Sequence, residues 1–544
     1  MWGQVAERYT AEQTDSFYAD GTWTSDTLFD VVAAQADARP DVACFRDSTS
    51  QLTYSELRAR ALEVAQGLTR LGVGRGDAVA VQLPNWSDFA PIVVGIARLG
   101  AVLVPVMPIF RRDECLHFLS TTRARVVFTA GRYKNFDHEA MHVSLKGDVP
   151  SLEHVVVVRD TAAVGAISLD EMTAGPVVDL PPTAGADDPF ACVFTSGTTS
   201  LPRGAVHTFN TMSAGARLLG RGWAYTSDDV QFGPSPVTHT TGLVTSVLLP
   251  FVHGASSYVM EAWEPVQGLR QIEKHGCTAA VTATTFLQML IDAYDPRQHD
   301  ASSLRFWCTA GSPIPASAVT AAREAVDGLQ VLSLYGRTEN ITTTMCILDD
   351  DPQRSLSPDG RALPGQKVKI VDFDGNEVTR GAEGDIAYRG AMNCLEYIGQ
   401  PIETADMFMA DGFSRSGDLG VMDADGYVRV TGRLKDIVIR GGLNISVRQV
   451  EDELSAHPSI QNVAVVGMPD PRLGERVCAY VMLKADAAPL TVDDLKTYLL
   501  GLDMAIQKVP ERVEIVGEMP TTPTGKIQKH VLRADIASKL EAAS

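Results

Sequence analysis

The chain has 544 residues, of which 45% are hydrophobic and 21% are charged, close to the averages for soluble globular proteins. This composition supports a large buried core and excludes a disordered, collagen-like or disulfide-rich scaffold. The 67 acidic side chains outnumber the 47 basic ones and give a formal charge of −20. We therefore expect no nucleic-acid partner and no anionic-membrane binding, because both require a broad positive face.

The sequence carries no sign of secretion or of a membrane span. Its eight cysteines are scattered and form no C-x-x-C pair, which is typical of reduced thiols in a cytoplasmic protein. The first twenty residues contain four acidic side chains and no long apolar run, so no signal peptide is expected. The most apolar stretch, 89–110, contains Arg98 and three prolines, and it predicts a core helix followed by Gly100 and a buried strand.

The first part of the chain alternates helical and strand patterns. Residues 53–71 have the apolar spacing of an amphipathic helix. Short apolar runs at 77–83, 100–106 and 124–129 predict buried strands. This β–α alternation favours an α/β fold in which helices cover parallel or mixed sheets.

The pattern changes from about residue 367. Short strands are joined there by turn signals such as Asp374-Gly375 and Asp425-Gly426, which predict a β-rich, antiparallel subdomain. We expect an N-terminal domain of residues 1–434, a small mobile C-terminal α+β domain of residues 435–544, and a hinge near Lys435. The elements predicted for the small domain are a helix at 447–455, strands at 463–468 and 477–483, a helix at 492–500, a strand at 513–516 and a terminal helix.

The strongest local signal is the run Thr195-Ser196-Gly197-Thr198-Thr199-Ser200-Leu201-Pro202-Arg203-Gly204. It follows a predicted buried strand at 190–194, and a helix is expected from about Thr208. Hydroxyls and backbone N–H groups between a strand and a helix form a natural phosphate-binding loop. Arg203 can neutralise phosphate charge, although the spacing is not that of a Walker A loop.

Four further motifs follow along the chain. They are Tyr335-Gly336-Arg337-Thr338-Glu339, Ser416-Gly417-Asp418, Gly432-Arg433-Leu434-Lys435-Asp436 and Pro523-Thr524-Gly525-Lys526. With the five motifs in this order, the chain resembles the adenylate-forming (ANL) superfamily, which includes acyl-CoA ligases, over nearly its whole length. The run Ile439-Arg440-Gly441-Gly442-Leu443-Asn444-Ile445-Ser446 is similar to that of bacterial ligases for medium-chain and alicyclic acids.

The resemblance implies a reaction in two steps. An acid carboxylate attacks the α-phosphorus of ATP, which releases pyrophosphate and forms an acyl-adenylate. The thiol of coenzyme A then attacks the acyl carbon, and AMP leaves. Because the first step brings two anions together, it needs Mg²⁺ and cationic donors. The expected ligands are therefore ATP/AMP, Mg²⁺, coenzyme A and a carboxylic acid or its adenylate, and homo-oligomer formation stays open.

The resemblance also gives roles to the nucleotide-binding residues. The phosphates would be held by Thr195, Ser196, Gly197, Thr198, Thr199 and Arg203. Glu339 would bind Mg²⁺, a hard ion that prefers carboxylate oxygen. Thr338 would bond the α-phosphate, and Tyr335, followed by Gly336, would stack on adenine. Gly311, Ser312 and Pro313 match the adenine-lining loop, although an ordinary strand-to-helix turn explains them equally well.

Two charged residues are expected at the ribose, and others in the catalytic steps. Asp418 would accept hydrogen bonds from the ribose hydroxyls, with Arg433 as a donor to the sugar or phosphate. Lys526 would reach the carboxylate and α-phosphate from the small domain and stabilise the transition state. Rotation at Lys435 would then remove Lys526.

For two further sites, a structural explanation competes with the role that the resemblance implies. Rotation at the hinge would open a thiol route over Arg440, Gly441 and Gly442, but a simple turn also accounts for this glycine pair. His239 matches a position near the acyl group, and a hydrogen-bonded structural histidine is an equal alternative.

The phosphate loop departs from the family pattern at two positions. Ser200 stands where the family usually has glycine, and Arg203 stands where it has lysine. A serine at a position that needs a positive φ carries strain, and arginine prefers bidentate contacts. The expected function is an acyl-CoA ligase for a bulky, alicyclic or medium-chain acid. The alternatives are a ligase that uses only a preformed acyl-adenylate, and an ATP-dependent amide synthetase.

Overall fold

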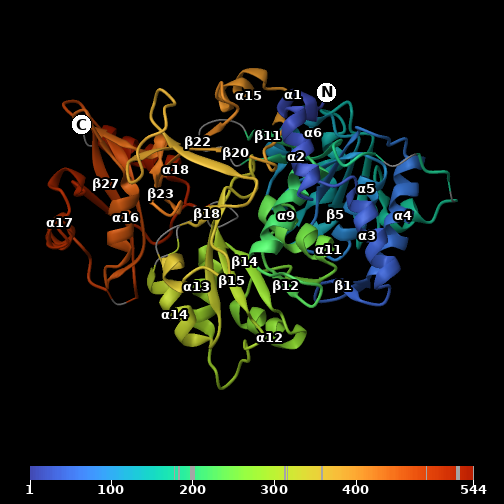
Figure 1. The fold of residues 1–544 in the computed structure, drawn as a ribbon, viewed down its shortest axis with the longest axis horizontal. Coiled ribbons are helices and arrows are strands. Elements are labelled where there is room, and N and C mark those ends of the chain that lie inside the picture. Colours follow the sequence, from blue (N-terminus) through green and yellow to red (C-terminus); the bar gives the residue numbers. More distant parts are fainter. Residues whose placement is uncertain are drawn as a thin grey trace.

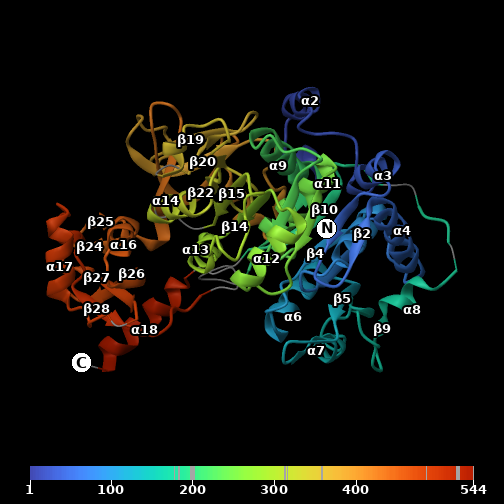
Figure 2. The same cartoon turned by 90° about the horizontal axis from the view of Figure 1, so that it is seen from below.

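The computed structural model describes residues 1–176, 178–181, 184–195, 202–311, 314, 316–356, 359–485, 487–521 and 527–542. It has an α/β fold with two large sheets, a β-rich subdomain and a C-terminal α+β unit (Figure 1). The first two-thirds of the chain occupies one side of the molecule, and the C-terminal unit forms the opposite end (Figure 2). The α/β class predicted from the sequence is therefore confirmed.

The first large sheet has eight strands in the order β21-β11-β10-β4-β3-β5-β8-β9. Its strands are β3 (Ala78–Gln82), β4 (Val102–Pro105), β5 (Val126–Ala130), β8 (His154–Val158), β9 (Ile167–Ser168), β10 (Pro189–Phe194), β11 (Gly204–Thr208) and β21 (Glu396–Tyr397). The strands from β10 to β9 are parallel, whereas β11 and β21 pair antiparallel at one edge. The strands predicted around 77–83, 100–106 and 124–129 are therefore present.

The second large sheet has nine strands in the order β18-β17-β16-β15-β14-β12-β13-β1-β2. They are β1 (Ala43–Arg46), β2 (Gln51–Thr53), β12 (Val230–Gly233), β13 (Ser256–Val259), β14 (Ala279–Thr282), β15 (Phe306–Ala310), β16 (Gln330–Tyr335), β17 (Thr344–Met345) and β18 (Arg361–Ala362). The strands from β1 to β16 run parallel, so the carboxyl ends of β14, β15 and β16 meet at one edge.

Helices cover both sheets. They are α1 (Val5–Arg8), α2 (Ala11–Ala19), α3 (Leu28–Ala38), α4 (Tyr54–Arg70), α5 (Phe89–Arg98), α6 (Arg112–Thr122), α7 (His138–Leu145), α8 (Leu169–Thr173), α9 (Phe209–Gly222), α10 (Thr240–Gly242), a π-helix (Leu243–Leu248), α11 (Leu249–His253), α12 (Pro265–His275), α13 (Thr284–Ala293), α14 (Ala316–Ala325) and α15 (Pro401–Met407). The helix predicted at 53–71 is α4, and its first turn is capped by the Thr53 hydroxyl, which accepts the Glu56 N–H at 3.2 Å.

The β-rich subdomain is an antiparallel sheet of β19 (Lys367–Val371), β20 (Glu383–Arg389), β22 (Ser414–Met422) and β23 (Val428–Arg433). Both predicted turns are present. Gly375 has φ = 87° and Gly426 has φ = 86°, values that glycine adopts without strain. The sheet lies between the two large sheets and the C-terminal unit (Figure 1).

The C-terminal unit contains every element that the sequence predicts there. Its sheet consists of β24 (Val438–Arg440), β25 (Leu443–Ile445), β26 (Ile460–Asp470), β27 (Gly474–Leu483) and β28 (Arg512–Ile515). Its helices are α16 (Val447–Ser455), α17 (Val492–Gly501) and α18 (Lys529–Ala542). One apolar cluster joins α16 and α17 to one face of the sheet, and another joins α18 to the opposite face. The exact boundary and the hinge at Lys435 stay predictions.

One expectation near the phosphate loop is wrong. The segment that follows β10 does not lead directly into a helix, because β11 (Gly204–Thr208) returns antiparallel to β10. The predicted helix does begin where expected, as α9 at Phe209 with Thr208 as its cap. All five residues of β11 are buried, and a run this short gives no periodicity that distinguishes a strand from a turn. The loop therefore joins two strands and has no helix N-terminus at its end.

The cysteines and the apolar helices agree with the sequence expectations. All eight cysteines belong to the described ranges, and they are buried with free thiols. Among the helices of those ranges, none is long and apolar enough to cross a membrane. The apolar stretch at 89–110 forms α5 and β4, as predicted.

Two buried histidines lie in the core beneath the eight-stranded sheet. The Gln82 side-chain oxygen accepts hydrogen bonds from His142 Nε2 at 2.7 Å and from His138 Nδ1 at 3.3 Å. Burial, reinforced by the neighbouring His138, lowers the pKa of His142 to about 3. Burial also lowers the pKa of His138 to about 4. Both side chains are therefore neutral in the folded protein at pH 7.

We expect acid to destabilise the fold through these histidines. The unfolded chain takes up a proton on each below a pKa of about 6.5, whereas the folded chain does not. The free energy of unfolding should thus fall by about 1.4 kcal/mol per pH unit for each histidine as pH decreases from about 6.5 towards the folded values. Urea denaturation at several pH values should show a shallower slope for His142→Gln than for the wild type. Equal slopes would contradict this explanation.

Candidate active site

A cavity of about 500 Å³ lies where the two large sheets, the β-rich subdomain and the predicted hinge meet. The carboxyl ends of β14, β15 and β16 open into it through Ala283, Gly311 and Gly336. Ligands in open α/β sheets bind outside the carboxyl ends of strands, so this position is typical of an active site.

The cavity brings together ten of the predicted site residues. They are Thr195, Arg203, His239, Gly311, Gly336, Thr338, Glu339, Asp418, Arg433 and Lys435. Residues Ser196, Gly197, Thr198, Thr199, Ser200, Ser312, Pro313 and Lys526 lie outside the described residues. Residues that are up to 240 positions apart in the sequence, from Thr195 to Lys435, thus surround one space.

Tyr335 is placed differently from its predicted neighbours. It is absent from the described lining of the cavity, and its hydroxyl donates to Asp418 Oδ2 at 2.6 Å. In this arrangement Tyr335 orients a carboxylate of the site. Its predicted stacking on adenine stays a prediction.

Arg440, Gly441 and Gly442 also lie away from the described cavity lining. The Arg440 guanidinium pairs with Glu511 at 3.0 Å within the C-terminal unit. Gly441 and Gly442 have φ values of 57° and 84° and form the turn between β24 and β25. The turn that was the alternative explanation is present, and the role in the thiol route stays a prediction.

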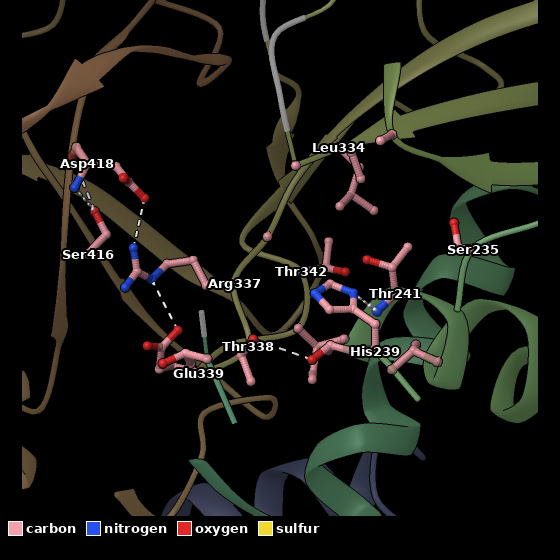
Figure 3. Close-up of a pocket in the computed structure, with 18 of the residues that line it drawn as sticks. Ser235, His239, Thr241, Leu334, Arg337, Thr338, Glu339, Thr342, Ser416 and Asp418 are labelled. Atoms are coloured by element: carbon pink, nitrogen blue, oxygen red, sulfur yellow. Dashed lines mark hydrogen bonds and ion pairs between the residues drawn. The ribbon is translucent and has the colours of Figure 1, made fainter. Parts of the chain in front are cut away.

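One end of the cavity is a cluster of charged side chains centred on Arg337 (Figure 3). Arg337 Nη1 contacts Asp418 Oδ2 at 2.8 Å, and Arg337 Nε lies 3.5 Å from Glu339 Oε2. Arg433 Nε contacts the other oxygen of Asp418 at 2.8 Å. The Tyr397 hydroxyl donates to Glu339 Oε1 at 2.6 Å. The two predicted ligand-binding carboxylates are therefore held in place by the protein.

These contacts set the charge of each group. Burial opposes ionisation of Glu339, but Arg337 and the Tyr397 hydroxyl hold its pKa below the usual range. Burial would likewise lower the pKa of Arg337, but Glu339 and Asp418 outweigh it and raise that pKa well above its ordinary value. Burial and the neighbouring Arg433 lower the pKa of Lys435. Glu339 and Arg337 are therefore both charged at neutral pH.

Arg203 extends the charged end towards the phosphate loop. Its guanidinium lies over the ring of Tyr397, 5.4 Å from the ring centroid. Because the hydroxyl of the same tyrosine binds Glu339, one side chain connects the arginine of the loop with the predicted metal ligand.

The surroundings of Glu339 fit a magnesium ion that is bound by one carboxylate and completes its coordination with water and phosphate oxygens. Within the described ranges, no group of three or more His, Cys, Asp or Glu side chains forms a complete metal site. Magnesium commonly takes one or two carboxylates and completes its shell with water and substrate phosphates. The ionised Glu339, which lines the cavity beside Thr338, suits such a site.

Away from the charged cluster the cavity has an apolar end, where Leu334 lies (Figure 3). The other apolar residues that line the cavity include Leu219, Val244, Val281, Phe286 and Ile341. His239 faces the same end together with Thr241 and Thr342 (Figure 3). The His239 Nδ1 accepts the N–H of Thr241 at 3.3 Å, and burial lowers the pKa of His239 to about 4. His239 is therefore neutral at pH 7 and both caps α10 and lines the cavity.

The π-helix Leu243–Leu248 supplies Val244 and Thr245 to this apolar end. Segments of π-helix are rare and occur frequently at functional sites, because the extra residue per turn displaces side chains from their regular positions.

Sequence reasoning missed three residues that support the site. Arg337 stands inside a recognised motif, so its charge was visible, but its two partners were not. Tyr397 gave no signal, since it lies 58 residues from Glu339 in the sequence. His207 also gave none, although its Nε2 donates to the Thr338 carbonyl at 2.7 Å and fixes that backbone.

Comparison with known proteins agrees with this geometry. The model of the AMP-binding enzyme family matches residues 32–398, and that of the AMP-binding enzyme C-terminal domain matches residues 449–526. The chain therefore belongs to the AMP-binding enzyme family, within the adenylate-forming superfamily of acyl-CoA ligases.

Individual relatives are similar over almost their whole length. The medium-chain fatty-acid–CoA ligase of Escherichia coli (strain K12) is 34% identical over 540 residues, which cover 99% of this chain and 95% of that protein. A CoA ligase of Rhodococcus jostii (strain RHA1), named for a 7a-methyl-1,5-dioxo-octahydro-1H-inden-4-yl propanoyl group, is 32% identical and covers 91% and 96%. An anthranilate CoA ligase solved in complex with anthranoyl-AMP has a TM-score of 0.87 and 26% identity and covers 96% and 98%.

Gly336 gives a direct test of how tightly the site is packed. A Cβ atom at this position would lie 2.0 Å from the carbonyl oxygen of Ile341. We expect Gly336→Ala to displace the loop and to lower the free energy of unfolding by about 1–3 kcal/mol, as overpacking does. Urea denaturation measures this change. Gly74→Ala is the matched control, because its Cβ would meet nothing within 4 Å. Equal stability of the two variants would contradict the packing argument.

Proposed function

We propose that this chain is an acyl-CoA ligase that converts a carboxylic acid, ATP and coenzyme A into acyl-CoA, AMP and pyrophosphate through an acyl-adenylate. The observation that carries the proposal is the single cavity with a charged end and an apolar end. Such a cavity suits a molecule that has a nucleotide at one end and an acyl group at the other. The AMP-binding family membership and the CoA ligases among the relatives support the same reaction.

The charged end would bind the nucleotide. Asp418 would accept the ribose hydroxyls, and Thr338 would donate to the α-phosphate. Arg203, with the loop that precedes it, would offset the charge of the outer phosphates. Glu339 would hold Mg²⁺ together with phosphate oxygens, and the ion would supply charge that screens the attack of one anion on another. Arg433 and Lys435 would add positive charge from the side of the hinge.

The apolar end would bind the acyl group, and its lining is the basis for the proposed substrate class. Leu219, Val244 and Ile341 provide apolar contact, while Thr241 and Thr342 are short side chains that leave space beside His239. We propose a bulky, alicyclic or medium-chain acid. The ligases of Escherichia coli and Rhodococcus jostii are named for a medium-chain fatty acid and for an acid with a fused-ring substituent.

The C-terminal unit would contribute in both half-reactions. Lys526 would stabilise the adenylation transition state, and rotation near Lys435 would then open a route for the thiol over residues 440–442. The helix that follows Lys526 is anchored close to the proposed hinge. Lys529 pairs with Glu451 of α16 at 2.7 Å, and Arg533 pairs with Asp436. This anchoring favours a fixed geometry between α18 and the hinge.

The second candidate is a ligase that uses only a preformed acyl-adenylate, as the substitutions Ser200 and Arg203 suggest. The position of Arg203 weighs in favour of the complete reaction, since Arg203 lines the cavity and its guanidinium lies over the ring of Tyr397. An amide synthetase remains a third candidate on the ground of shared adenylation chemistry alone.

The deciding experiment measures pyrophosphate release and thioester formation with ATP, Mg²⁺ and a panel of aliphatic, alicyclic and aromatic acids. Each acid is assayed with coenzyme A, without it, and with an amine panel in its place. We expect pyrophosphate and thioester with medium-chain or alicyclic acids. Thioester from a synthetic acyl-adenylate, without pyrophosphate from any free acid, would establish the second candidate, and amide products without thioester would establish the third.

Lys526 allows the two half-reactions to be separated. We expect Lys526→Ala to slow adenylation by at least about 100-fold, because it removes a charge that stabilises the transition state. Thioester formation from a supplied acyl-adenylate should change much less, since the lysine has left the site in that step. Lys484→Ala, which alters an exposed lysine of the same unit, is the control. Equal losses in both half-reactions would contradict the role of Lys526.

A further inference from the structure

Arg337 joins two parts of the site that belong to different structural units. It lies in the loop after β16 of the nine-stranded sheet, next to Thr338 and Glu339. Its nearer partner, Asp418, lies on β22 of the β-rich subdomain. A guanidinium in contact with both segments links the proposed phosphate and metal residues to the proposed ribose carboxylate.

Both oxygens of the Asp418 carboxylate accept from donors on other strands and loops. Arg433 reaches Oδ1 from β23, where it is the register partner of Asp418. Arg433 therefore belongs to the same subdomain and fixes the carboxylate only relative to its own sheet. Arg337 and the Tyr335 hydroxyl reach Oδ2 at 2.8 Å and 2.6 Å, and both come from the nine-stranded sheet.

The two donors on Oδ2 differ in how firmly they can fix the direction of the Asp418 carboxylate. The Tyr335 hydroxyl rotates about its C–O bond and is uncharged at neutral pH. The Arg337 guanidinium is planar and charged, and it also lies 3.5 Å from Glu339. The hydrogen bond from Arg337 to Asp418 is charge-assisted, and such bonds are stronger than those from a neutral donor. Arg337 is thus the group best suited to set the direction of the Asp418 carboxylate relative to the phosphate side.

From this geometry we infer that Arg337 is a positioning residue for the ribose, which acts through Asp418 by fixing that carboxylate relative to the phosphate-binding loop. The inference rests on the proposed function, because it assumes that Asp418 accepts the ribose hydroxyls. It predicts that Arg337 governs how well the protein distinguishes a ribose with hydroxyls from one without them.

The test is a binding cycle between Arg337 and the ribose hydroxyls, measured by isothermal titration calorimetry in EDTA. The probes are AMP and 2′,3′-dideoxy-AMP, which share the base and the phosphate. We expect the wild type to bind AMP at least about 10-fold more tightly, the value of a hydrogen bond to a charged group. In Arg337→Gln this preference should fall to about threefold or less. Loss of charge attraction to the phosphate affects both probes equally and cancels from the ratio.

Two further variants control for disruption of the fold. Arg337→Lys keeps the charge but loses the planar fork, so its preference should lie between those of the wild type and Arg337→Gln. It also carries the test alone if Arg337→Gln does not fold. Arg415→Gln removes a different ion pair from β22, between Arg415 and Asp385 at 2.9 Å, and should keep the full preference.

The outcomes separate the inference from the proposed function. A preference in the Arg337 variants equal to that of the wild type would overturn the inference while AMP binding itself stands. An equal loss in Arg415→Gln would also overturn it, because the effect would then reflect general disturbance of β22. Failure of the wild-type protein to bind AMP would overturn the proposed function as well.

Discussion

The charged end of the cavity depends on one buried ion cluster, in which Arg337 lies between the carboxylates of Glu339 and Asp418. These two residues have exposed fractions of only 6% and 2%, so water offsets little of their charge. An uncompensated buried charge costs several kcal/mol, whereas a set of paired charges in good geometry is tolerated. The loop after β16 and the strand β22 are thus held together by charge as well as by apolar packing. Preorganised charge of this kind needs no rearrangement at the moment of reaction.

The rest of the fold supplies the frame for that cluster. Parallel strands β14, β15 and β16 end at one edge, which places three loops side by side without long connections. The eight-stranded sheet contributes Arg203 after β10 and Tyr397 on β21, and these two strands are joined through β11. The histidine His207 of β11 holds the Thr338 carbonyl, so the two sheets meet directly beneath the proposed α-phosphate position.

Much of the fold could be predicted from local sequence pattern, but the contacts that hold the site residues in place could not. The helix α4 and the elements of the C-terminal unit have regular spacing and clear caps, so their type and order were predictable. The strand β11 was missed because five consecutive buried residues give no periodicity. The motif residues around Glu339 and Asp418 were recognised from resemblance, and ten predicted residues line one cavity. The contact of Tyr397 with Glu339 and that of Arg337 with Asp418 were not predictable, because they join segments 58 and 81 residues apart.

Part of the apolar lining comes from segments that contribute nothing to the ion cluster, and this has an evolutionary consequence. The ion cluster comes from the loop after β16 and from β22 and β23, whereas Leu219, Val244 and Val281 come from α9, the π-helix and β14. Mutations in these last three elements can reshape the apolar lining without replacing a member of the ion cluster. A lineage with this architecture can explore new acids one substitution at a time while its chemistry is inherited unchanged, and divergence of substrate range should outpace divergence of mechanism.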